Sequence, residues 1–381
     1  MTPQPDALSL ALQNRIRQDV QSMHAYAVQD STGMVKLDAM ENPHRLPAHL
    51  QAELGKRLGA LALNRYPDGR VNDLRRALAA YAGMPEGFEL MLGNGSDELI
   101  SLLALACQVP GAGVLAPVPG FVMYAMSAQL QGLAFIGVPL TADFELDEVA
   151  MLAAIAEHRP SIVYLAYPNN PTANLWDDAV IEKIIDAVGA QGGLVVMDEA
   201  YQPFSSKSYI DRIARHSHVL LMRTLSKFGL AGVRLGYMMG PKALIAEFDK
   251  VRPPYNISVL NCEAALFALE HQPVFAAQAA DLVQQRERLM TALRAMPGLQ
   301  VWNSDANMIL VRVLDADANA QASAPGAGGD AAGRVFERLK AGGVLIKNIS
   351  KMHPLLANCL RLTVGTADEN TQLLAILEKS L

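Results

Sequence analysis

The chain has 381 residues, 51% of them hydrophobic, and its formal net charge is −6. A chain of this length and composition buries a large core, and the length predicts two domains, or a large domain with a smaller one. The negative net charge and the lack of a dense Lys/Arg cluster argue against the basic surface that nucleic-acid binding requires. We therefore expect no nucleic-acid partner.

The N-terminal residues 1–20 do not have the pattern of a signal peptide, and the longest apolar stretch, 99–109, is too short to cross a bilayer. We therefore expect a soluble, cytoplasmic protein that does not enter membranes. The cysteines, Cys107, Cys262 and Cys359, are widely separated. This spacing predicts buried thiols rather than disulfides, and no metal site is expected.

Between about residues 72 and 240, helical patterns alternate with short β-rich runs. The helical patterns cover 72–83 and 177–191, and the β-rich runs cover 161–167, 193–201 and 218–224. This alternation predicts an α/β fold with a mostly parallel sheet and helices on both faces. Ligands of such sheets bind beyond the carboxyl ends of the strands, so the candidate site residues are sought there.

The pattern changes after the proline pair at 253–254, where we place a domain boundary. A long helix is expected around 265–293, followed by strands at 306–313, 342–349 and 359–366. The Ala-, Gly- and Asp-rich segment 315–333 is interpreted as a flexible surface loop.

The stretch GNGSDELI, 93–100, places glycines, Ser96 and Asp97 ahead of an apolar helix. Such a helix start offers free backbone N–H groups and the positive end of the helix dipole, which suit a phosphate group. The alternative is an ordinary capped helix with Ser96 as its N-cap. On this stretch alone the alternative is favoured.

Two other strand ends carry polar residues. The loop YPNNPTANL, 167–175, contains Asn170, and its Asn and Pro residues are equally well explained as a turn. Asp198 ends an apolar strand, where a carboxylate is costly unless it has a partner. A structural ion pair would satisfy Asp198 as well as a ligand would.

Lys227 and Arg234 lie in RTLSKFGLAGVRLGY, 223–237, where glycines permit close approach to the backbone. A single lysine is usually a surface residue. Together, however, a strand-end lysine, a strand-end acid and a phosphate-binding helix start match the needs of pyridoxal 5′-phosphate. These needs are an amine for a Schiff base, a partner for the pyridine nitrogen and an anchor for the phosphate.

Eight motifs in order extend this match over nearly the whole chain: LDAMENPHRLP (37–47), NRYPDG (64–69), GNGSDELI, PNNPT (168–172), DEAY (198–201), TLSK (224–227), LAGVRLGY (230–237) and CLRLTVGT (359–366). On these motifs the chain resembles the class II pyridoxal-phosphate aminotransferases of fold type I, and among them the histidinol-phosphate aminotransferase family. The resemblance implies an N-terminal arm and part of a small domain over 1–45. It also implies a large α/β cofactor-binding domain over 46–254 and a small α+β domain over 255–381.

The resemblance also implies roles for individual residues. Lys227 would bond the cofactor aldehyde and move a proton during the reaction, and Asp198 would pair with the pyridine nitrogen. Tyr201 and Asn170 would bond the cofactor's O3′. Phe121 would stack on its ring, and Tyr124 either supports Phe121 or only packs.

For the cofactor phosphate, the family implies Ser96, Asp97, Ser226 and Arg234. Tyr66 matches a tyrosine that reaches the phosphate of the neighbouring subunit, so a homodimer with shared active sites is expected.

For the substrate anion, the family implies Arg361, Lys347 and Tyr26. The implied reaction transfers the amino group of L-histidinol phosphate to 2-oxoglutarate in histidine biosynthesis.

Three departures from the family pattern have structural consequences. The run from Lys227 to Arg234 is one residue shorter, which bears on the phosphate role of Arg234. Ala173 replaces the usual glycine after PNNPT, at a cost of roughly 1 kcal/mol if this position needs a positive φ. Lys347 stands in place of an arginine and meets a phosphate only as a point charge.

Other functions on this scaffold are an aromatic amino acid aminotransferase and a threonine-phosphate decarboxylase. A non-catalytic pyridoxal-phosphate-binding regulator is a third alternative, but the chain has no spare N-terminal domain and no basic helix for binding DNA.

Overall fold

The computed structural model describes residues 6–23, 25, 28–314 and 330–381. Contacts divide the chain into two units, residues 1–33 and residues 34–381. The first unit contains α1 (Ala7–Arg15) and α2 (Gln18–Gln21), and the Asp6 side chain caps α1 by accepting a hydrogen bond from the Ser9 N–H. All elements described below belong to the second unit.

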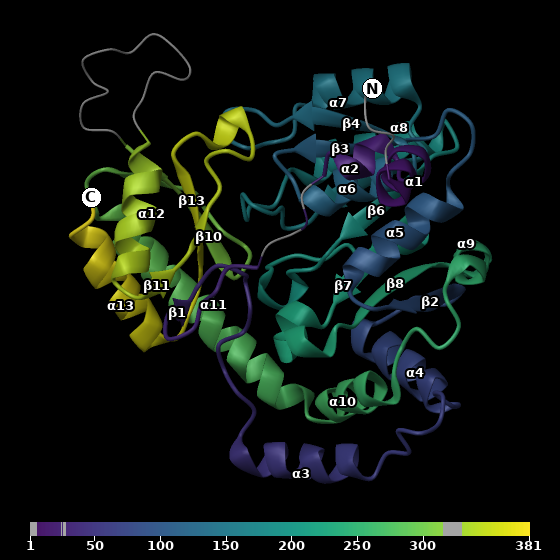
Figure 1. Cartoon of the computed structure of the whole chain (residues 1–381), viewed down its shortest axis with the longest axis horizontal. Helices are drawn as coiled ribbons and strands as arrows, with labels where there is room; N and C mark the ends of the chain where they lie inside the picture. The colour runs from purple at the N-terminus through teal and green to yellow at the C-terminus, as the bar shows by residue number, and fades with distance from the viewer. Residues whose placement is uncertain (1–5, 24, 26–27, 315–329) are drawn as a thin grey trace. The chain divides into compact units, whose positions relative to one another are not determined.

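A seven-stranded sheet forms the centre of the second unit (Figure 1). In chain order its strands are β2 (Phe88–Gly93), β3 (Gly113–Val118), β4 (Ala134–Pro139), β5 (Ile162–Ala166), β6 (Leu194–Asp198), β7 (Val219–Thr224) and β8 (Gly236–Pro241). Their spatial order is β2-β8-β7-β6-β5-β3-β4. Strand β8 pairs antiparallel with β2 and β7, while the β7-β6, β6-β5, β5-β3 and β3-β4 pairs are parallel, so the prediction of a mostly parallel sheet is confirmed.

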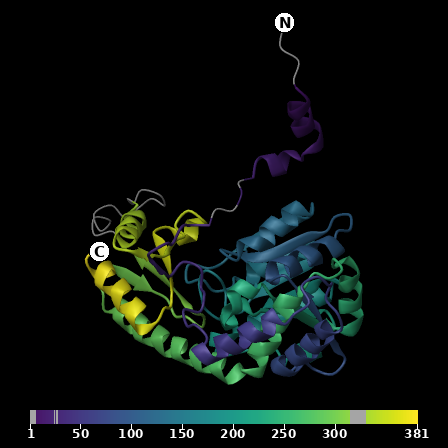
Figure 2. The same ribbon diagram turned by 60° about the horizontal axis from the view of Figure 1, so that its bottom comes forward.

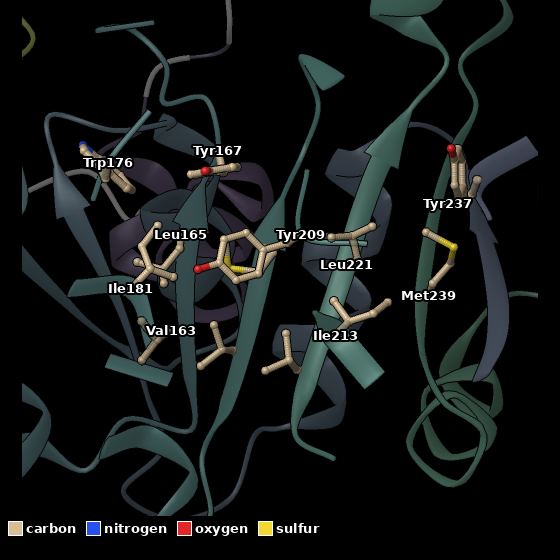
Figure 3. Packing of buried hydrophobic residues seen from close by; sticks show 14 of the residues in the cluster. Val163, Leu165, Tyr167, Trp176, Ile181, Tyr209, Ile213, Leu221, Tyr237 and Met239 are labelled. Carbon is tan, nitrogen blue, oxygen red and sulfur yellow. The ribbon is translucent and has the colours of Figure 1, made fainter. Parts of the chain in front are cut away.

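Helices cover both faces of this sheet because its strands are apolar on both sides. In β5, Val163 and Leu165 pack on one face, while Ile162 and Tyr164 pack on the other. The first face is covered by α4 (Arg70–Ala82), α7 (Glu148–His158), α8 (Asp178–Gly189) and α10 (Val259–Glu270), and the second by α5 (Ser96–Ala106), α6 (Val122–Leu130) and α9 (Lys242–Phe248). Figure 3 shows Val163 and Leu165 close together and Leu221 on another strand of the same core.

The predicted long helix at 265–293 is wrong, because the structure has two helices there. The first, α10, ends at Glu270, and α11 (Gln272–Arg294) begins with Pro273 in its first turn. Proline lacks the N–H that would continue α10, but it fits the first turn of a new helix. Helix α11 then runs from the end of α10 to the smaller C-terminal sheet described next, and α3 (Ala48–Gly59) packs on α10 (Figure 2).

A smaller antiparallel sheet contains the three C-terminal runs predicted as strands. It has the order β12-β13-β10-β9, with bounds β9 (Leu299–Val301), β10 (Met308–Val313), β12 (Lys347–Asn348) and β13 (Cys359–Thr363). The run 342–349 is not one strand, because β11 (Val344–Leu345) pairs in parallel with β1 (Val35–Lys36) instead. Helices α12 (Ala331–Ala341) and α13 (Ala367–Glu378) pack with this sheet.

Single turns of helix connect several of these elements. They are η1 (Gln202–Phe204), η2 (Ile213–Arg215), η3 (Ser226–Leu230), η4 (Ala231–Val233), η5 (Asp249–Val251) and η7 (Pro354–Leu356).

The predicted loop at 315–333 lies mostly outside the described residues, which resume at 330. Its last residues are not a loop, since the Asp330 side chain caps α12 and the helix begins at Ala331. Ala173 has a φ of 64°, so its position does require the left-handed conformation that favours glycine. No helix in the described part of the chain is long and apolar enough to span a membrane.

Replacing Leu165 with Ala should lower the free energy of unfolding by about 2–5 kcal/mol, because it leaves a cavity in the central core. Leu165 is 0% exposed in β5. Denaturant unfolding followed by circular dichroism measures the change. The control Val149→Ala, at a side chain that is 79% exposed, should stay within about 0.5 kcal/mol of the parent. Equal losses of unfolding free energy in the two variants would contradict the placement of Leu165 in the packed core.

Candidate active site

A cavity of about 400 Å³ lies at the carboxyl ends of β5, β6 and β7. Ala166, Asp198 and Thr224, the last residues of these strands, all line it. The predicted site residues that line it are Ser96, Asp97, Phe121, Asn170, Asp198, Tyr201, Ser226, Lys227 and Arg234. The parallel sheet therefore gathers, at one edge, residues from motifs that are distant in sequence.

The first turn of α5 forms one wall of the cavity. The helix begins at Ser96, and its N-cap is Gly95 with a φ of 80°, so the alternative with Ser96 as N-cap is wrong. A Cβ at position 95 would lie 2.7 Å from Nη2 of Arg234. Only glycine therefore lets the guanidinium reach the helix start, where free N–H groups and the helix dipole favour an anion.

Arg234 reaches this wall despite the shortened segment after Lys227. The segment folds into η3 and η4, and Arg234 itself has a φ of 54°. Its Nη1 donates to Ser226 Oγ at 3.5 Å, and its Nη2 lies 3.4 Å from Asp97 Oδ2. The guanidinium, the Ser226 hydroxyl and the start of α5 thus converge on one place.

Lys227 lies just beyond β7, and its ammonium group faces the cavity. Its Nζ donates a hydrogen bond to the carbonyl oxygen of Ala39 at 3.1 Å. Desolvation, followed by the positive charge of Arg361, lowers the pKa of Lys227 to about 8. More of this amine is uncharged at neutral pH than of a surface lysine, so it is a better nucleophile and base.

Asp198 ends β6 and is only 4% exposed. Its Oδ2 accepts from the Tyr124 hydroxyl at 2.6 Å, and its Oδ1 accepts from the Ala200 N–H at 3.0 Å. Burial raises the pKa of Asp198 to about 6, although these two hydrogen bonds act to lower it. A cationic group bound in the cavity could form an ion pair with this buried carboxylate.

Arg361 in β13 is buried and is connected to the cavity through Asn170. Its Nη1 donates to Asn170 Oδ1 at 2.8 Å, and its Nη2 donates to the Asp38 carbonyl oxygen at 2.8 Å. Lys347 pairs directly with Arg361 across the sheet, so both side chains leave the same face. Neither of them is among the described residues that line the cavity itself.

Tyr66 lies apart from the cavity of its own chain. Its side chain is 77% exposed, and its ring stacks on Tyr255 with centroids 4.6 Å apart. It borders a separate hollow of about 110 Å³ that Arg70 and Cys262 also line. Tyr26 lies outside the described residues.

Residues 39–41 form part of the cavity wall, which the sequence analysis missed. The successive carbonyl groups at 38–40 accept hydrogen bonds from Arg361, Lys227 and Asn307. Backbone acceptors leave no mark in the side-chain sequence, so only the motif LDAMENP signalled this segment. Tyr124 was also missed as a partner of Asp198.

Comparisons with known proteins agree with this geometry. The model of the family "Aminotransferase class I and II" matches residues 32–377. A histidinol-phosphate aminotransferase from Polaromonas naphthalenivorans is 77% identical over 381 residues, which cover 100% of both chains. Another from Methylibium petroleiphilum is 71% identical over 363 residues, covering 95% of this chain and 94% of that protein.

A solved structure shares the fold. The histidinol-phosphate aminotransferase from Sinorhizobium meliloti, solved in complex with pyridoxal-5′-phosphate, superposes with a TM-score of 0.80. It is 23% identical, and the match covers 96% of this chain and 97% of that one. The chain therefore belongs to the class I and II aminotransferases, has the fold type I architecture of pyridoxal-phosphate enzymes, and is highly similar in sequence to histidinol-phosphate aminotransferases.

Proposed function

We propose that the chain transfers the amino group of L-histidinol phosphate to 2-oxoglutarate, giving imidazole acetol phosphate and L-glutamate in histidine biosynthesis. The observation that carries this proposal is the cavity that joins Lys227, Asp198 and the anion-binding start of α5. The same cavity holds an amine with a lowered pKa and a buried carboxylate with a raised one. Opposed shifts of this kind are typical of acid–base sites.

Pyridoxal 5′-phosphate is the cofactor, and the residues present fit it. Its phosphate needs a cradle, which the missing Cβ of Gly95 opens beside Arg234. Its ring nitrogen needs an acid, and Asp198 is a buried carboxylate that would gain from a cation. When bound, the cofactor supplies an aldehyde that accepts the amino group and a ring that accepts an electron pair.

Within this proposal each cavity residue has one task. Lys227 would bond the cofactor aldehyde and would move a proton to and from the substrate carbon, for which its pKa of about 8 is suited. Asp198 would pair with the ring nitrogen and hold a proton there. Tyr201 and Asn170 would donate hydrogen bonds to the ring oxygen, and Phe121 would pack against the ring.

The phosphate of the cofactor is assigned to Ser96, Asp97, Ser226 and Arg234. These residues offer three kinds of donor: the Ser226 hydroxyl, the Arg234 guanidinium and the backbone N–H groups at the start of α5. The contact between Asp97 and Arg234, at 3.4 Å, keeps the guanidinium directed toward the start of α5.

The anionic group of the substrate is assigned to Arg361 and Lys347, while the expectation for Tyr26 concerns a residue outside the described part of the chain. The two cationic side chains leave the same face of the small sheet, and the Arg361 guanidinium is buried. Burying a charged guanidinium is costly unless an anion binds it, and this supports the assignment of Arg361 to the substrate anion.

We also propose a homodimer with shared active sites. Tyr66, Tyr255, Leu63 and Leu260 are large hydrophobic side chains that are exposed in the single chain. A second copy covering Tyr66 would bring this tyrosine to the partner's cofactor phosphate.

The domain division into 1–45, 46–254 and 255–381 belongs to the same proposal. It is supported by the position of the large sheet within 88–241 and of the four-stranded sheet within 299–363. A cytoplasmic location is proposed as well, because the three cysteines are free thiols, which suit a reducing compartment.

The half-reaction tests the substrate. Mixing the holoenzyme with L-histidinol phosphate, without an oxo acid, should change the cofactor absorbance to that of pyridoxamine phosphate. The second-order rate constant with L-histidinol phosphate should exceed that with phenylalanine by roughly 100-fold. Phenylalanine has no phosphate group, so the cationic side chains assigned to the substrate anion would have no phosphate to bind. Faster conversion of phenylalanine would favour an aromatic aminotransferase, and release of CO2 from phosphothreonine would favour the decarboxylase.

Replacing Lys227 with Ala should reduce turnover by roughly 1000-fold or more, because it removes both the covalent link and the proton-transferring amine. The absorbance of the linked cofactor should disappear, while noncovalent binding persists through Arg234. Lys250→Ala is the control, since this side chain is 66% exposed on the surface. Undiminished turnover in the Lys227 variant would remove the central claim.

Replacing Arg361 with Ala should leave the cofactor spectrum intact and raise KM for both substrates by roughly 10- to 100-fold, because a charged hydrogen bond is lost. Steady-state kinetics measure this change. Arg312→Ala removes an arginine of the same sheet that stacks on Trp302 instead, and its KM values should match the parent. Unchanged kinetics in the Arg361 variant would place the anion site elsewhere.

A further inference from the structure

The carboxylate of Asp198 is held by donors from two separate parts of the chain. Tyr124 in α6 donates to Oδ2 at 2.6 Å, and the Ala200 N–H donates to Oδ1 at 3.0 Å. Tyr124 and Asp198 are 3% and 4% exposed, so water does not compete for these bonds. A carboxylate oxygen can accept more than one hydrogen bond, so each oxygen of Asp198 keeps acceptor capacity.

Packing fixes the position of the Tyr124 hydroxyl. Its ring stacks on Tyr164, with centroids 4.2 Å apart and an interplanar angle of 7°. Phe121 meets the same ring edge-on, at 5.6 Å and 85°. The hydroxyl therefore has one direction, which is toward Asp198.

The other groups around Asp198 make its negative charge costly. The titratable and charged side chains near it are Asp97 in α5, Tyr164 in β5, Glu199 and Tyr201 after β6, and Lys227 after β7. The two carboxylates among them raise the pKa of Asp198, in addition to burial. Glu199 is itself paired with Arg223, whose Nε lies 2.9 Å from its Oε2. The Tyr124 hydroxyl is the donor side chain that opposes these effects.

We propose that Tyr124 is a positioning residue of the transamination site, whose hydroxyl orients Asp198 and keeps its carboxylate ionised so that the proton stays on the cofactor's ring nitrogen. The inference rests on the proposed function. In a buried site, an acid and a pyridine nitrogen that share a proton compete for it, and the neutral pair avoids the cost of two buried charges. A hydrogen bond to the carboxylate favours the charged pair, because it is stronger than one to the neutral acid.

Tyr164 offers a matched control. It lies in the same aromatic stack and is equally buried, but its hydroxyl has no hydrogen-bond partner among the described residues. Tyr164→Phe therefore removes a hydroxyl from the stack without removing a bond to Asp198. Tyr124→Phe keeps the ring and removes only the donor.

The test compares four holoenzymes: the parent, Tyr124→Phe, Tyr164→Phe and Asp198→Asn. Infrared spectroscopy across a pH series follows the carboxylic-acid band of Asp198, which is identified by its absence in Asp198→Asn. In Tyr124→Phe, protonation of Asp198 should move upward by about one to two pH units, as loss of a charged hydrogen bond predicts. Its kcat should fall by roughly 10- to 100-fold, while Tyr164→Phe should match the parent in both measurements.

Two results would overturn the inference. The titration in Tyr124→Phe could coincide with that of the parent, or both phenylalanine variants could shift equally, which would assign the effect to packing. Thermal unfolding of each variant checks that the fold is retained. Full turnover in Asp198→Asn would instead contradict the role of Asp198 in the proposed function, so the two failures are distinguishable.

Discussion

The parallel pairing of β5, β6 and β7 is the constraint on which the site depends. Because these strands run in one direction, Ala166, Asp198 and Thr224 end at the same edge of the sheet. The loops that follow must turn there, and they carry the amide of Asn170 and the amine of Lys227. The antiparallel β8 then returns from this edge, which leaves Arg234 beside the start of α5.

Burial in that cavity acts on the two central ionisable groups in opposite directions. It disfavours the charged form of each, so the pKa of Lys227 falls to about 8 while that of Asp198 rises to about 6. The lowered pKa suits Lys227 to proton exchange near physiological pH, whereas the raised pKa of Asp198 means that its buried charge is costly until a cation meets it. The hydrogen bonds from Tyr124 and Ala200 act to lower the pKa of Asp198, and the hydrogen bond from Lys227 to the Ala39 carbonyl oxygen helps to fix the position of the amine.

Much of the fold follows from local sequence patterns. The β-rich runs that contain β5, β6 and β7 and the helical patterns of α4 and α8 were predicted within a few residues, because each has a clear apolar period. The predictions failed where two opposing sequence signals lie close together in the chain. Pro273 divides a continuous helical pattern, and the run 342–349 is shared between two sheets. The N-cap at Gly95 was missed because serine is the stronger capping residue by propensity.

The sequence by itself determined the chemistry that is available: a lysine, an aspartate and an arginine in motifs that match one cofactor, at the ends of recognisable strands. Only the tertiary structure decided which partners these groups have. Tyr124 and Asp198 are 74 residues apart, and Arg361 reaches a carbonyl group 323 residues away. The physical reason is that burial and hydrogen-bond geometry depend on how the sheets and helices pack, and no local pattern encodes a contact over such separations.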